Sequence, residues 1–62
     1  MLERIIELCK QKGMTIAELE RKSGLQPRTV YKWNRSTPSV DKVLAVANAL
    51  GTTVEDLSKG GD

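Results

Sequence analysis

Histidine and phenylalanine are absent from the 62 residues of this sequence, and cysteine, tryptophan and tyrosine occur once each. A single cysteine cannot form a disulfide within the chain, and the lack of histidine nearly excludes a zinc site with several protein ligands. No apolar run reaches the length of about 18 residues that a membrane-spanning helix needs. Because Glu3 and Glu7 interrupt the N-terminal apolar residues, the sequence predicts neither a signal peptide nor an association with membranes.

The same shortages argue against catalysis. There is no histidine to act as a general base, and Cys9 lies in an apolar stripe with no base beside it. The acidic residues are scattered, and no glycine-rich loop follows a strand, since no strand is predicted. The sequence therefore predicts that the protein is not an enzyme and has no cofactor, metal or small-molecule substrate. Cys9 itself is expected to be a small buried hydrophobic residue.

Basic residues are concentrated in the middle of the chain. The net charge is only +2, but residues 21–35 contain five basic residues and no acidic one. A surface with this concentration of positive charge favours a polyanionic partner. The five basic residues are Arg21, Lys22, Arg28, Lys32 and Arg35.

The spacing of apolar residues predicts a single small domain of class all-α, a compact bundle of five helices. Its core must be mainly aliphatic, with Trp33 as its one large ring, because aromatic residues make up only 3% of the sequence. Gly13, Gly24 and Gly51 are each expected to end a helix. The predicted helices cover residues 2–12, 16–23, 27–34, 40–50 and 54–58, and residues 59–62 are expected to form a frayed tail.

Residues 15–33 predict a helix, a tight turn and a second helix, which together form a helix-turn-helix. Thr15 and Glu18 have the spacing of a capping box at the start of the first of these helices. After it, Glu20, Arg21 and Lys22 are expected to face water.

In the second helix of this motif, Pro27 suits the first turn, with Gln26 at the N-cap position. The spacing of Val30 and Trp33 places both on one buried face. Arg28 and Lys32 lie four residues apart and are expected to share an exposed face of the same helix. Ser39 and Thr53 are expected to cap the two following helices.

The sequence resembles the lambda-repressor-like domains of phage Cro and repressor proteins, also called XRE-type domains, over roughly residues 3–58. The motifs that carry the resemblance are residues 13–19 (GMTIAEL), 23–25 (SGL), 29–33 (TVYKW), 38–39 (PS) and 47–57 (ANALGTTVEDL). The resemblance implies a five-helix DNA-binding domain over residues 1–58, whose third helix enters the major groove.

The resemblance also implies two sets of DNA contacts. The base-contacting positions are Gln26, Pro27, Arg28, Thr29 and Lys32. The phosphate-contacting positions are Thr15, Tyr31, Arg35, Ser36, Thr37, Ser39 and Val40. Many family members pair an arginine of the first helix with a glutamate that ends the third, and here these positions hold Cys9 and Asn34. We therefore expect Trp33 to supply apolar packing in place of that ion pair.

Three functions remain open at this point. The first is sequence-specific binding of double-stranded DNA by a transcriptional regulator, located in the cytoplasm and at the nucleoid when bound. The second is an isolated or engineered DNA-binding domain, and the third is an antitoxin-like or adaptor module that binds protein instead. A monomer, or a weak homodimer on DNA, is expected, because residues 54–58 offer few apolar side chains for a dimer interface.

Overall fold

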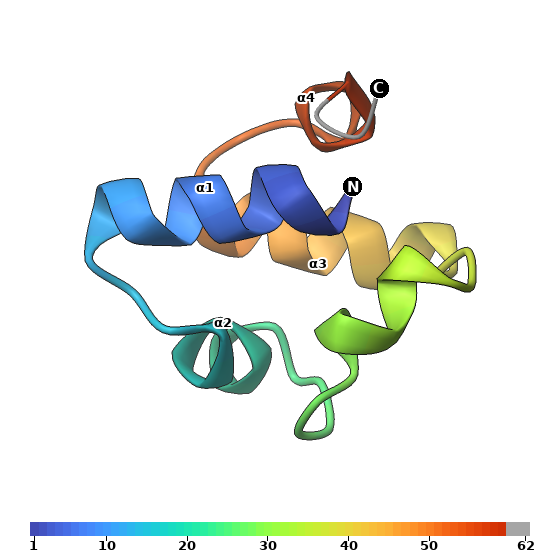
Figure 1. Cartoon of the computed structure of the whole chain (residues 1–62), viewed down its shortest axis with the longest axis horizontal. Coiled ribbons are helices and arrows are strands. Elements are labelled where there is room, and N and C mark those ends of the chain that lie inside the picture. The colour runs from blue at the N-terminus through green and yellow to red at the C-terminus, as the bar shows by residue number, and fades with distance from the viewer. Residues whose placement is uncertain (60–62) are drawn as a thin grey trace.

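The computed structural model describes residues 1–59, which fold into four α-helices and one short 3₁₀ helix (Figure 1). No strand occurs among these residues, so the all-α prediction is confirmed. The prediction of five α-helices is corrected to four, because the expected third helix is the shorter 3₁₀ segment. The elements are α1 (Leu2–Lys12), α2 (Ile16–Lys22), η1 (Val30–Asn34), α3 (Val40–Leu50) and α4 (Val54–Lys59).

A single apolar core joins the five elements. Helix α4 packs on α1 and α3. Helix α2 also packs on α1 and α3, and η1 packs on α1. Cys9 and Trp33 both belong to this core, as expected from the missing arginine–glutamate pair. The buried residues are Ile5, Leu8, Cys9, Leu19, Val30, Trp33, Val43, Val46, Ala47, Leu50 and Leu57. Burial raises the pKa of the Cys9 thiol.

The helix ends follow the local signals of the sequence. At the start of α2, the N–H of Glu18 donates to Thr15 Oγ1 at 3.1 Å, which confirms the capping box. Gly13 and Gly51 follow α1 and α3 with φ of 66° and 70°. The N–H of Asp56 donates to Thr53 Oγ1 at 3.1 Å in the first turn of α4.

Two predicted ends differ in detail. Ser39 occupies the N-cap position of α3, but its side chain makes no capping hydrogen bond. The last helix, α4, ends at Lys59, one residue beyond its predicted end at residue 58. The rest of the predicted frayed tail, residues 60–62, lies outside the described part of the chain.

A polar contact ties the N-terminal helix to the C-terminal one. Arg4 of α1 donates to both carboxylate oxygens of Asp56 in α4, at 3.1 and 3.2 Å. Arg4 also pairs with Glu7 on its own helix, and Thr52 donates to Asp56 Oδ2 at 2.6 Å. The hydrogen bond to Asp56 is the largest cause that raises the pKa of Arg4. Charge on this side of the molecule is thus neutralised between helices.

Candidate nucleic-acid interface

The chain makes a tight turn between α2 and η1. The N–H of Thr29 donates to the carbonyl oxygen of Gln26 at 3.2 Å, which closes a four-residue β-turn. Proline fixes φ near −65° at Pro27, while Arg28 has a φ of 67°. A β-turn with these signs at its two central residues is type II, and its third position is normally glycine or asparagine. Arginine in this left-handed conformation is strained by about 1–2 kcal/mol.

This turn corrects the predicted third helix, which was expected to begin at Pro27. The 3₁₀ helix begins only at Val30, because the positive φ of Arg28 cannot continue a helix. Gln26 is therefore not its N-cap; its carbonyl instead accepts the Thr29 hydroxyl at 2.7 Å. Arg28 lies outside the helix that contains Lys32. The prediction that the two side chains share a helix face is therefore wrong.

The prediction that Glu20 faces water is wrong. Only 4% of Glu20 is exposed. Its two carboxylate oxygens accept the backbone N–H groups of Arg28 and Val30, each at 3.0 Å. A carboxylate that is removed from water needs such donors, because an unpartnered buried charge is costly. One signal in the sequence pointed to this role: an acidic residue in the last turn of a helix is disfavoured by the helix dipole and calls for another partner.

The segment η1 is held by its apolar face. Val30 is fully buried and Trp33 is 8% exposed, so the predicted shared face of these two residues is confirmed. Because this face packs toward α1, the residues between them lie on the outside. Tyr31 is 51% exposed, and Lys32 and Asn34 are exposed as well.

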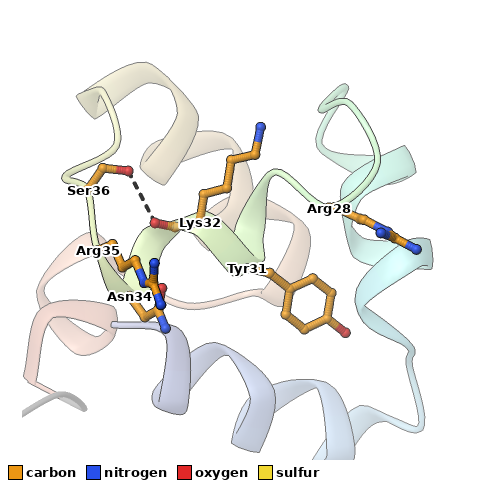
Figure 2. A pocket seen from close by; sticks show the side chains of 6 residues that line it. All are labelled: Arg28, Tyr31, Lys32, Asn34, Arg35 and Ser36. Carbon is orange, nitrogen blue, oxygen red and sulfur yellow. Dashed lines mark hydrogen bonds between the residues drawn. The ribbon is translucent and has the colours of Figure 1, made fainter.

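An open hollow of about 610 Å³ lies over η1 and the residues on either side of it. Figure 2 shows Lys32 and Tyr31 leaving η1 in different directions, with Arg28 on one side and Arg35 on the other. The Ser36 hydroxyl donates to the carbonyl oxygen of Lys32 at 3.1 Å and so fixes the loop after η1. The lining residues are Arg28, Tyr31, Lys32, Asn34, Arg35 and Ser36.

The charged side chains that line this hollow are all basic. Arg28, Lys32 and Arg35 are exposed, and none of them forms an ion pair with an acidic side chain within residues 1–58. Glu20, the last acidic residue before this segment, uses its carboxylate on backbone N–H groups. The hollow can therefore attract an anion without first breaking an internal pair.

Five of the twelve predicted contact residues line this hollow: Arg28, Lys32, Tyr31, Arg35 and Ser36. Asn34 lines it too, although no contact was predicted for it from the sequence. An amide next to three cations is chemically able to bond a base edge or a phosphate. Its place next to the basic residues Lys32 and Arg35 was the signal that could have identified it.

The other predicted contacts lie elsewhere on the surface. Thr37 and Arg35 line a neighbouring hollow of about 240 Å³ beside Trp33, and Pro27 lines one of about 200 Å³ against α2. Gln26 is exposed, and Thr29 is half-buried.

Thr15 is the N-cap of α2, the first helix of the motif, and Ser39 and Val40 begin α3, the helix that follows the motif. Ser39 is exposed with its hydroxyl uncommitted to a cap, and Val40 is 74% exposed at the start of α3. At Thr15 the hydroxyl already contacts the Glu18 carboxylate at 3.4 Å. Because that carboxylate repels a phosphate, Thr15 is less suited to contact DNA than Ser39.

Other kinds of site find no support in residues 1–59. No helix there is both long enough and apolar enough to cross a membrane. No group of histidine, cysteine, aspartate and glutamate side chains in that range could hold a metal ion.

The chain matches the family described as the Cro/C1-type HTH DNA-binding domain over residues 4–59, which is nearly its whole length. Neither a curated protein nor a solved structure gave a significant match. The chain therefore belongs to the Cro/C1-type helix-turn-helix family of DNA-binding domains, as its lambda-repressor-like motifs predicted. Domains of this family act on DNA as regulators rather than as enzymes.

Proposed function

We propose that this protein, over a domain of residues 1–58, binds double-stranded DNA sequence-specifically and regulates transcription by occupying its site. The observation that carries the proposal is the hollow over η1, where Arg28, Lys32 and Arg35 are exposed and have no acidic partner within residues 1–58. In a family of DNA-binding domains, such a surface matches the negative charge of a duplex.

In this proposal the turn and η1 enter the major groove. Arg28 bonds the O6 and N7 atoms of a guanine, because the guanidinium can donate to both. Lys32 contacts a neighbouring base edge, and Gln26, Pro27 and Thr29 complete the base-facing surface. The remaining contacts are to phosphates and come from Tyr31, Arg35, Ser36, Thr37, Ser39 and Val40, with Thr15 at the edge of the interface.

The proposal is tested by selecting bound duplexes from a random pool and measuring the affinity of the selected site at low and high salt. We expect a defined site whose binding weakens steeply with salt. Binding that ignores salt, or no binding to any duplex, would contradict the proposal and favour the protein-interaction module. A palindromic site would indicate a dimer on DNA, and a single half-site a monomer.

Substitution Arg28→Ala then tests the assignment of the base contact. We expect the affinity for the selected site to fall by roughly 1–3 kcal/mol and the preference at one base pair to relax. Competition against a panel of single-base variants of the site measures both quantities. Equal weakening toward every sequence would contradict a base contact by Arg28.

A further inference from the structure

Glu20 has no place in the interface described above, yet it determines the backbone on which that interface is built. Its carboxylate is buried and accepts the N–H groups of Arg28 and Val30, both at 3.0 Å. These two donors lie on either side of Thr29, one in the turn and one at the first residue of η1. One side chain of α2 therefore holds two peptide groups of the DNA-facing segment, those on the N-terminal side of Arg28 and of Val30.

The direction of the Arg28 side chain depends on the hydrogen bonds that Glu20 accepts. With a φ of 67°, Arg28 adopts a backbone conformation that an arginine does not favour without external support. The β-turn hydrogen bond from Thr29 to Gln26 does not involve the N–H of Arg28. Among the hydrogen bonds of the described residues, the bond from the Arg28 N–H to Glu20 is the one that joins the peptide group between Pro27 and Arg28 to α2.

We propose that Glu20 is a positioning residue for DNA recognition: by holding the Arg28 and Val30 amides, it directs the Arg28 side chain and so sets the base preference. This inference rests on the proposed function and assigns to α2 a part in specificity without any contact to DNA. Glu20 itself lies behind the turn, where its charge is withdrawn from the duplex.

Substitution Glu20→Gln tests the inference on the site selected with the unaltered protein. The amide keeps one acceptor oxygen but places an NH₂ donor against the second backbone N–H, so one of the two bonds is lost. We expect roughly a tenfold loss of discrimination at the base pair that Arg28 reads. Glu55→Gln is the control, because Glu55 is an exposed acid on α4 and its substitution changes the net charge equally.

A double-mutant cycle separates positioning from a merely structural role. In an Arg28→Ala background, Glu20→Gln should change discrimination at that base pair by less than about twofold, since the side chain it directs is gone. A loss of the same size with and without Arg28 would overturn the inference. Retained discrimination in Glu20→Gln, together with its loss in Arg28→Ala, would overturn this inference alone and leave the proposed function intact.

Folding of the variants is followed by Trp33 fluorescence, and Glu20→Asp provides a second probe. Aspartate keeps the charge but is one methylene shorter, so it cannot reach both amides and should also lose discrimination. If neither variant folds, Glu20 is a residue of the fold rather than of specificity, and the inference is overturned. If the unaltered protein binds no duplex, the proposed function fails first and the inference with it.

Discussion

Two regions beside the N-terminal half of α1 use positive charge in opposite ways. Near α4, Arg4 is paired with Asp56 and Glu7, so its charge joins one helix to another. Near η1, Lys32 and Arg35 are exposed with no acidic partner in residues 1–58. In the first region the positive charge forms ion pairs within the fold, whereas in the second region it remains available to a ligand.

The two regions also differ in the regularity of their backbones. The α1–α4 contact joins regular helices, with Asp56 N–H bonded to the capping hydroxyl of Thr53. The η1 region combines a five-residue 3₁₀ helix with a left-handed arginine and a buried carboxylate. Strain of this kind persists only where the surrounding structure holds it, and it is concentrated at functional sites.

Removing the side chain that holds η1 to the core should damage both regions. For Trp33→Ala we expect the free energy of unfolding to fall by about 3–5 kcal/mol, because a large buried ring leaves a cavity. That is comparable with the whole stability of so small a domain. Urea unfolding followed by circular dichroism measures the loss. The matched control is Tyr31→Ala on the exposed face, which should stay within about 0.5 kcal/mol of the original protein.

Relieving the strain at Arg28 should separate stability from recognition. We expect Arg28→Gly to be more stable than Arg28→Ala by about 1 kcal/mol, since glycine adopts a φ of 67° without a Cβ clash. Both variants should lose the same base preference, because both lack the guanidinium. Thermal unfolding and duplex competition on the two proteins check this. An alanine variant as stable as the glycine variant would argue against a left-handed residue 28.

Arg4→Ala should give the reverse pattern to Arg28→Ala. Loss of the bonds to Asp56 is expected to lower the urea midpoint slightly, with DNA affinity at a given salt concentration nearly unchanged. Because the Arg4 guanidinium is accessible to solvent, the stability change should be small and should shrink as salt is added. A large loss of DNA affinity in a fully folded Arg4→Ala protein would place part of the interface on α1.

Much of this fold was predictable because its signals are local. The Thr15–Glu18 capping box, the glycines after α1 and α3, and the buried spacing of Val30 and Trp33 each depend on residues within four positions of one another. The positively charged segment was predictable for the same reason. What was missed was the Glu20 contact, which joins a side chain to amides eight and ten residues away, so that its partners could not be identified from local spacing.

The start of η1 was mispredicted for a related reason. A proline is favoured both in the first turn of a helix and at the second position of a type II turn. The residue that decides between them is the next one, and arginine gives no signal for a left-handed conformation. The predicted common face of Arg28 and Lys32 is wrong for this reason. Asn34 was overlooked because the resemblance associated its position with an ion pair inside the fold and not with a DNA contact.

The central claim is that the cations over η1, and not those elsewhere, bind the duplex. The most direct measurement is the slope of log Kd against log salt concentration for two doubly substituted proteins of equal net charge. We expect Lys32→Gln with Arg35→Gln to make the slope shallower by about 0.9, because Arg35 is the one of the two that neutralises a phosphate in the proposed interface. Lys10→Gln with Lys12→Gln, at the far end of α1, should leave the slope unchanged (Figure 1). Equal changes in the two proteins would contradict the account.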